Sequence, residues 1–540
     1  MRVSDIAMEP MQAVRSPGVL RALTQRPKPV VDIVLKEEEQ NAPTPFYTTL
    51  DKIEGEVSIT APSDMKFDTI EINFTGSERT YVEILSTTAP TSTKAFAYRP
   101  FLELKQPINA AASPQHRVLQ AGRAYKLPFT FVIPEQLLPQ ACRHATDNDQ
   151  VREAHVSLPP SLGHPILPSD GKSSLNDLAP DMSTVLYAIK VKISRDREGE
   201  GKPIILADVA KKIRVIPAYD EHPPLNIPAG KNDDYSLRKE KDLKKGMFKG
   251  KLGRLTAEAA QPRSLRLHAP RSESSCRVTT MATMNLRFDP AEENARAPRL
   301  GRLVTKLKVA TFFASAPMRD IPSNSAAFRF DNRRGLYVET LNLSSRNVES
   351  VQWEKHTATS DAERGSSAHS VSSAASIPEP SSAYCGKTYY TASIVVPITL
   401  PEDKSFVPTF HSCLISRIYV LDFSLSVHTP GTSVTSPMMH LKVPVQVSSE
   451  RNADAQPLIS PEEARAIAAR EADGYFTPRS FASPSPEYTE RAELVRPASQ
   501  VTSLPIRTAA QPPGNSILAR SEQGLDFAAA TPVCLSSTCC

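Results

Sequence analysis

The chain has 540 residues, of which 48 are Pro and only 20 are Gly, and its formal net charge is +5. Because Pro inside a helix costs about 3 kcal/mol, prolines at this density exclude a long helical bundle or solenoid. The scarcity of Gly argues against functions that need Gly-rich phosphate loops. The composition therefore favours an all-β body with Pro at the strand ends, accompanied by disordered Pro-rich segments.

Features of targeting and redox chemistry point to the cytoplasmic side of membranes. Seven cysteines, an odd number without framework spacing, fit a reducing compartment. No stretch of about 18 apolar residues occurs, so we expect no membrane-spanning helix. The N-terminus carries Arg2, Asp5 and Glu9 instead of an apolar run, so we expect no signal peptide. These features predict a protein that is cytoplasmic and peripheral to the plasma membrane or endosomes.

The first long block of the chain has the pattern of strands. Residues 1–28 are irregular and are predicted to be disordered, but from 29 to 220 apolar and polar residues alternate with a period of two, as in half-buried strands. The clearest strand runs from Tyr125 to Ile133 and stops at Pro134. Strands at short spacing, with no helical period between them, predict a β-sandwich.

A basic segment, 221–248, separates this block from a second one, 249–450, which has the same alternation. Nine basic and four acidic residues lie in 231–254, so this surplus equals the net charge of the whole chain. The rest of the chain is neutral, which argues against a nucleic-acid-binding protein. We interpret 221–248 as a linker between two domains, and the Ser- and Ala-rich insert at 355–386 as a mobile loop.

The C-terminal region, 451–540, is polar, rich in Pro and free of Lys, and it is predicted to be a disordered tail. It contains one helix signal. Ser460-Pro461-Glu462-Glu463 forms a capping box with Pro at the first helical position, and Gly474 provides the stop. These residues predict a short helix near 461–473.

Motifs of catalysis are missing from the sequence. It contains no G-x-G-x-x-G loop, complete P-loop, G-x-S-x-G elbow, H-E-x-x-H or C-x-x-C pattern. Cys142, His144 and His155 offer three metal ligands, but no fourth lies near them, so we interpret them as loop residues between strands. Cys413 and His411 have the spacing of neighbours on one strand face, as a Cys–His nucleophile would, but a packed cysteine is the favoured interpretation. We therefore expect no enzyme activity, cofactor or metal.

The two blocks also carry a series of short phrases in a fixed order. They are Gly55, Gly76, 125–134 (YKLPFTFVIP), 155–163 (HVSLPPSLG), 181–183 with Tyr187, 305–313, 389–401 (YYTASIVVPITLP) and 408–421 (PTFHSCLISRIYVL). The series extends over about 29–450 and resembles the fungal α-arrestin-like family. The resemblance implies two immunoglobulin-like antiparallel β-sandwich domains, the arrestin N- and C-terminal-like domains. It also implies a non-enzymatic adaptor that links plasma-membrane cargo to a HECT-type ubiquitin ligase for endocytosis.

Adaptors that resemble this chain recruit the ligase through P-P-x-Y motifs, which WW domains bind as a rigid polyproline helix. This chain has no complete motif, because Asn226 stands where Pro223-Pro224 would need Tyr. The reduced form Pro217-Ala218-Tyr219 lies at a domain edge and is interpreted as structural. A second reduced form lies in the tail, where Pro486 and Tyr488 are the partner-binding candidates. The departure leaves open a signalling or sorting scaffold without ligase recruitment and, more remotely, a hydrolase on a β-sandwich.

Four lysines of the basic segment are candidate functional residues: Lys239, Lys241, Lys244 and Lys245. As in related adaptors, they are candidates for accepting ubiquitin. They are also candidates for contacting anionic lipid headgroups, and a solvated linker is the third alternative. Expected partners are membrane transporters or receptors, a WW-domain ubiquitin ligase and an anionic membrane surface, but no nucleic acid.

The tail carries candidate modification sites. The phosphorylation candidates precede Pro or follow an Arg by three positions, and they are Thr477, Ser483, Ser485 and Ser499. The C-terminal pair Cys539-Cys540 lacks the spacing of a CaaX box but is a candidate for lipidation.

Overall fold

The computed structural model describes residues 28–452 except for 40–45, 86–91, 109–113, 164–175, 197–202, 226, 228–233, 246–249, 271, 273–275, 358–376, 381–383, 385, 387 and 430–435. The predicted disordered N-terminal segment, apart from residue 28, lies outside the described residues. So does the tail from residue 453 onward, with its predicted helix near 461–473. In the described ranges, no helix is long and apolar enough to cross a membrane.

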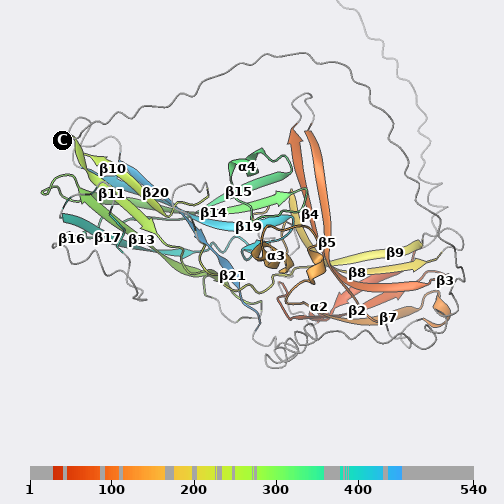
Figure 1. Ribbon diagram of the computed structural model, residues 1–540. Coiled ribbons are helices and arrows are strands. Elements are labelled where there is room, and N and C mark those ends of the chain that lie inside the picture. The colour runs from red at the N-terminus through yellow and green to blue at the C-terminus, as the bar shows by residue number, and fades with distance from the viewer. Residues whose placement is uncertain are drawn as a thin grey trace, which may run out of the picture. The chain divides into compact units, whose positions relative to one another are not determined.

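The first sandwich consists of a three-stranded and a four-stranded sheet (Figure 1). The smaller sheet has the order β1 (Val30–Leu35), β2 (Lys52–Thr60), β7 (Ala124–Val132). The larger sheet has the order β5 (Ser92–Lys105), β4 (Thr69–Leu85), β8 (Ser183–Arg195), β9 (Ile204–Ile213). All neighbours in these two sheets are antiparallel. Two further short strands of the same part of the chain, β3 (Met65–Lys66) and β6 (Val118–Leu119), form an antiparallel pair.

The alternation in the sequence explains how the first sandwich packs. On β7, Leu127, Phe129 and Phe131 are buried, while the residues between them are exposed. These three side chains share one apolar core with Ile72 on β4 and Ile189 on β8, so the two sheets pack face to face. Burial of each such side chain contributes about 1.5–3 kcal/mol, which makes the period of two the main determinant of the fold.

The second sandwich also has two larger sheets. One has the order β10 (Arg238–Lys244), β11 (Lys251–Ala259), β13 (Thr279–Pro290), β17 (Thr388–Thr399), β16 (Glu354–Thr357). The other has the order β15 (Arg334–Asn347), β14 (Arg299–Ala314), β19 (Ile415–His428), β18 (Phe410–His411), with β20 (Met438–Val445) also paired to β19. One apolar core joins them. Among the described strands, β12 (Leu265–Leu267) and β21 (Val447–Ser449) form the parallel pair.

The helices in the described ranges are short. They are α2 (Lys36–Glu39), η1 (Gln115–Arg117), η2 (Pro139–Ala141), α3 (Asp149–Val156) and α4 (Ala326–Phe330). With two antiparallel sandwiches and short helices, the prediction of an all-β sandwich fold is confirmed. The strand predicted from Tyr125 to Ile133 corresponds to β7.

The basic segment differs from the linker that we predicted at 221–248. Its residues 238–244 form β10, an edge strand of the second sandwich. Glu240 and Asp242 interleave with the basic residues and pair with Arg254 on β11, at 3.4 and 2.8 Å. Leu243 is buried in the core. The net charge of the segment does not reveal that acidic and basic residues alternate along it. This alternation allows the segment to form a charged edge strand of the sheet.

The insert predicted at 355–386 lies mostly outside the described residues. Its first residues, 355–357, complete β16, which pairs with β17. Residues 377–380, 384 and 386 are also described. The prediction of a mobile loop stays a prediction.

Candidate functional site

The two sandwiches meet at an interface that contains both apolar and polar contacts. The segment 405–415 belongs to the second sandwich by sequence, but its apolar residues lie in the core of the first. Val407, Phe410, Leu414 and Ile415 are at most 2% exposed and share the apolar cluster of β4, β7 and β8. The phrase PTFHSCLISRIYVL therefore crosses from one core to the other.

Polar contacts cross the same interface. The Thr80 hydroxyl on β4 donates a hydrogen bond of 2.6 Å to the carbonyl of Ala314 on β14. Arg417 on β19 donates from Nη1 to the carbonyl of Asp177 at 3.0 Å. Since these groups are largely buried, each bond satisfies an atom that would otherwise lose its water partner.

A buried ion pair lies next to this junction. Glu78 on β4 is fully buried, and its Oε2 is 3.3 Å from Nη1 of Arg99 on β5. Burial raises the pKa of Glu78, and the positive charge of Arg99 opposes that shift. Arg99 also donates from Nη2 to the carbonyl of Ala141. Arg99 thus joins the four-stranded sheet to the loop in which the next group lies.

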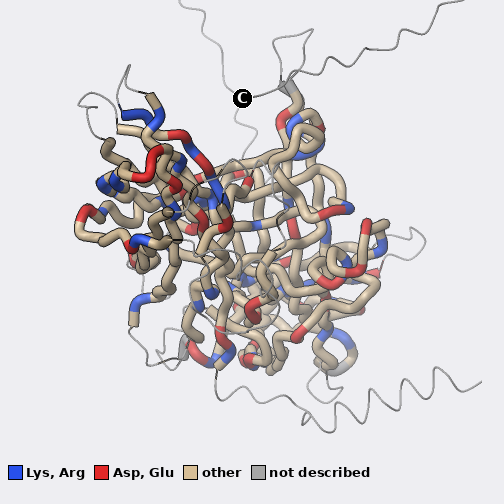
Figure 2. Tube along the Cα trace, turned by 60° about the vertical axis from the view of Figure 1, so that its left-hand side comes forward, with Lys and Arg blue, Asp and Glu red and all other residues tan. Residues whose placement is uncertain are grey.

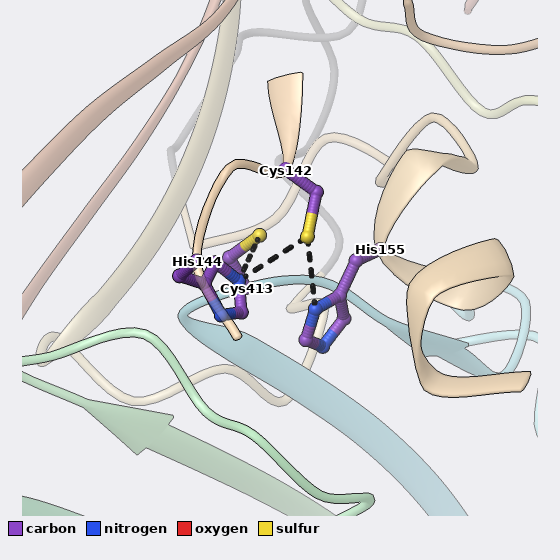
Figure 3. Close-up of side chains that lie close together, drawn as sticks. All are labelled: Cys142, His144, His155 and Cys413. Atoms are coloured by element: carbon purple, nitrogen blue, oxygen red, sulfur yellow. Dashed lines mark hydrogen bonds between the residues drawn. The ribbon is translucent and has the colours of Figure 1, made fainter. Parts of the chain in front are cut away.

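Four metal-binding side chains converge at the interface (Figure 3). They are Cys142, His144 and His155 from the first sandwich and Cys413 from the second, and their ligand atoms all lie within 4.8 Å of one another. Cys142 Sγ is 3.3 Å from His144 Nε2 and 3.7 Å from His155 Nδ1. His144 Nε2 is also 3.1 Å from Cys413 Sγ. We call this group the Cys/His cluster.

Local structure fixes the three residues from the first sandwich. Cys142 follows η2, which begins at Pro139, and α3 starts after Asn148, whose side chain accepts a hydrogen bond of 2.9 Å from the Val151 amide. This cap sets the start of the helix. Val151 and His155, four residues apart, form the buried face of α3, which turns the His155 ring toward Cys142.

A tight turn positions the fourth residue. Cys413 lies between β18 and β19, and the Ile415 amide donates to the Ser412 hydroxyl oxygen at 3.1 Å. The Met318 amide donates to the Cys413 carbonyl at 2.8 Å. The side chain of Cys413 is completely buried, so the backbone of the turn determines where its sulfur lies.

Burial shifts the protonation equilibria of two side chains in the cluster. Burial lowers the pKa of His155 to about 3, so its imidazole is neutral. Burial raises the pKa of the Cys413 thiol well above its usual range. His144 Nδ1 is 3.0 Å from the Ala145 carbonyl, and a proton on Nδ1 leaves the Nε2 lone pair directed at the two sulfurs. Four protein ligands complete a tetrahedral coordination sphere, so the cluster can hold an ion but leaves no open position for a substrate.

The structure brings Cys413 to Cys142, His144 and His155 as a fourth ligand, which the sequence did not indicate. Cys413 is buried, as the favoured interpretation of a packed cysteine expects, and it lies in the turn before β19 rather than on one strand face with His411. His411 instead hydrogen-bonds Ser416 through Nδ1.

The four predicted lysines lie on or beside the edge strand β10. Lys239, Lys241 and Lys244 are exposed, and Lys241 donates to the Met438 carbonyl at 3.2 Å. Lys245 is half-buried and pairs with Glu292 at 2.6 Å. Figure 2 shows basic and acidic residues interspersed along the trace. The structure thus presents three of the four lysines to solvent.

The other predicted sites fall into two groups. Pro217-Ala218-Tyr219 is part of the interface, because the Tyr219 amide donates to the Ser449 carbonyl of β21 at 3.1 Å, while the Tyr219 ring packs against the first core. The sites in the tail lie outside the described residues: Pro486, Tyr488, Thr477, Ser483, Ser485, Ser499, Cys539 and Cys540.

A scan against known protein families matches residues 110–181 to the family described as Bul1 N terminus. This is a yeast family of arrestin-related trafficking adaptors, which are non-catalytic. The match agrees with the α-arrestin-like resemblance seen in the sequence. It covers β6, β7 and α3, and with them Cys142, His144 and His155. A search of the curated proteins finds no match to the chain.

Proposed function

We propose that the chain is an α-arrestin-like, non-enzymatic adaptor that links plasma-membrane cargo to a HECT-type ubiquitin ligase for endocytosis. The family match at residues 110–181, within an all-β fold of two sandwiches, is the observation that carries the proposal. In this proposal the protein works in the cytoplasm, at the periphery of the plasma membrane or endosomes. Its cargo is a membrane transporter or receptor.

The ligase-binding part of the proposal rests on the tail. Pro486 and Tyr488 supply the last proline and the tyrosine of a WW ligand, while the first proline of the full motif is replaced by Ser485. Tyr219, in the other reduced motif, is held at the interface between the sandwiches, so its side chain is not available to a WW groove. The tail motif is therefore the candidate that remains.

Tyr488→Ala is expected to weaken binding of the full chain to purified WW domains of a HECT ligase by at least about tenfold, or 1.4 kcal/mol. The reason is that the tyrosine ring fills the aromatic groove that gives the motif its specificity. The measurement is a calorimetric titration of the full chain with the WW domains. Tyr475→Ala is the matched control, because Tyr475 is a tail tyrosine without a proline two positions before it.

Unchanged affinity in Tyr488→Ala would show that the site is misplaced. No binding by the wild-type chain would instead favour the second candidate function, an arrestin-fold signalling or sorting scaffold. The incomplete motif in the sequence is the observation that favours this second candidate.

The lysines of β10 are proposed as ubiquitin acceptors. Lys239, Lys241 and Lys244 are exposed, and Glu240 and Asp242 interrupt the positive charge. An unbroken polybasic segment is what anionic lipid recognition uses, so lipid contact is the weaker alternative.

Replacing Lys239, Lys241 and Lys244 together by Arg is expected to remove most of the ubiquitin attached to the chain by the ligase, while binding to anionic vesicles is retained because the charge is unchanged. Mass spectrometry of the modified lysines is the measurement. The matched control replaces Lys52, Lys105 and Lys126, exposed lysines of the first sandwich, by Arg. Modification that persists at full level in the β10 variant would contradict the assignment.

The tail sites are proposed to regulate these contacts. Phosphorylation of Ser485 places about −1.5 to −2 charges directly before Pro486 and would alter WW docking; Thr477, Ser483 and Ser499 are the other proposed sites. Acylation of Cys539 and Cys540 would add two membrane anchors.

A further inference from the structure

We propose that the Cys/His cluster is a structural zinc site that fastens the two sandwiches to each other. The ligands are Cys142, His144 and His155 of the first sandwich and Cys413 of the second. The proposal does not depend on ligase recruitment, because it rests on the geometry of these four side chains alone.

The donor set and its distances fit zinc. Two sulfurs and two imidazole nitrogens in a tetrahedral arrangement are typical of Zn²⁺. With Zn–S near 2.3 Å and Zn–N of about 2.0–2.1 Å, neighbouring sulfur and nitrogen ligands of a tetrahedron lie about 3.6 Å apart. The three sulfur–nitrogen distances in the cluster are 3.1, 3.3 and 3.7 Å. Shifts of about half an ångström therefore bring the ligands into place around an ion.

The surroundings of the cluster also support an ion. The His144 Nδ1 contact with the Ala145 carbonyl orients the ring for binding through Nε2, as outer partners do for metal-binding histidines. Arg99 donates to the carbonyl of Ala141, next to Cys142, and so helps to hold the loop that carries this ligand. Among the residues that the structure describes, the Cys/His cluster is the one group of His, Cys, Asp or Glu side chains whose ligand atoms lie close enough together to hold a metal ion.

Charge balance makes the bound state suitable for a buried interface. Binding follows Zn²⁺ + 2 Cys–SH → Zn(S–Cys)₂ + 2 H⁺, in which each thiol gives up its proton and both histidines stay neutral. The resulting site carries no net charge, so burial of three of its four side chains costs little electrostatic free energy. Four protein ligands close the coordination sphere, so the ion has a structural role.

The consequence is a cross-link between distant parts of the chain. His155 and Cys413 are 258 positions apart in the sequence, and they come from α3 and from the turn before β19. Backbone and side-chain bonds between Asp147 and Arg319 already join the neighbouring loops at 2.9 and 3.2 Å. A bound zinc ion would add four metal–ligand bonds that span the two sandwiches, and its binding free energy would stabilise the contact more than these hydrogen bonds and this ion pair do.

The test measures metal directly. The full chain is purified without added chelator, and its zinc content is measured by elemental mass spectrometry. We expect about one zinc ion per chain. The double variant Cys142→Ser, Cys413→Ser is expected to lose it. Cys276→Ser is the matched control, because Cys276 is an exposed free cysteine outside the cluster, and replacement of Cys534, Cys539 and Cys540 by Ser controls for the tail.

A second measurement needs no variant to fold. Metal-free wild-type chain titrated with Co²⁺ is expected to develop the visible absorption of a tetrahedral site with two thiolates, at about one equivalent. Wild-type chain without that spectrum, or zinc content equal in the double variant and the Cys276→Ser control, would overturn the proposal. So would a Cys142–Cys413 disulfide found in chain from reducing cytosol.

Discussion

Phe410→Ala is expected to lower the free energy of unfolding by about 3–5 kcal/mol, because it leaves a cavity where two cores meet. Phe410 is 1% exposed. It lies on β18 of the second sandwich but packs in the apolar core of the first, with Val407 and Leu414 beside it. Its removal therefore weakens both the first core and the interface. Urea unfolding followed by circular dichroism measures the change, taken from the earliest transition because the chain has more than one domain.

Phe330→Ala is the matched control for this prediction. Phe330 ends α4 and is 89% exposed, so its truncation is expected to change the free energy of unfolding by less than about 0.5 kcal/mol. Equal small effects of the two substitutions would mean that the segment 405–415 does not pack in solution as described.

Glu78→Ala is expected to cost about 3–5 kcal/mol of stability, because it removes one partner of a buried ion pair and leaves the other charge uncompensated. Glu78 is fully buried, and Arg99 is 14% exposed with a contact of 3.3 Å to it. The measurement is again urea unfolding. A second readout is proteolysis of the loop around Ala141, whose carbonyl accepts a hydrogen bond from Arg99.

The same strand provides the control for this charge. Glu83, also on β4, pairs with Lys94 at 3.3 Å, but both side chains are about half exposed. Glu83→Ala is therefore expected to change stability by no more than about 1 kcal/mol, as for other surface ion pairs. If Glu78→Ala proves as mild as Glu83→Ala, the buried ion pair does not stabilise the first sandwich as described.

Much of the fold follows from local sequence pattern. The residues from Tyr125 to Ile133 alternate so strictly that only one face of the strand can be buried, and β7 is the result. β10 shows where this kind of inference fails. The surplus of basic residues led us to predict a linker at 221–248. The alternation of Glu240 and Asp242 with basic residues, together with the buried Leu243, instead indicates an edge strand.

The Cys/His cluster could be predicted only in part. Cys142, His144 and His155 lie within 14 positions of one another and are visible as a group of ligands. Cys413 joins them through the packing of two sandwiches, and no local pattern in the sequence encodes that contact. The favoured interpretation of Cys413 as a packed cysteine agrees with its burial, but it gave no sign of the partners that the packing brings to it.

The two sandwiches are thus joined by the apolar segment 405–415 and by the contacts of the Cys/His cluster, and the buried Glu78–Arg99 pair lies within the first sandwich. In the proposed function, this body carries a tail that recruits partners. The arrangement places the proposed ligase-binding residues, Pro486 and Tyr488, in a different part of the sequence from the residues that hold the body together. Substitutions in the tail are therefore expected to separate partner recruitment from folding.

The most direct test of the proposed adaptor function is quantitative mass spectrometry of plasma-membrane proteins in cells of the source organism that lack this chain. The account predicts that a set of transporters or receptors becomes more abundant at the surface and less ubiquitinated. Wild-type chain restores both quantities, and Tyr488→Ala, expressed at the same level, does not. A surface proteome and ubiquitination that do not change when the chain is lost would contradict the account.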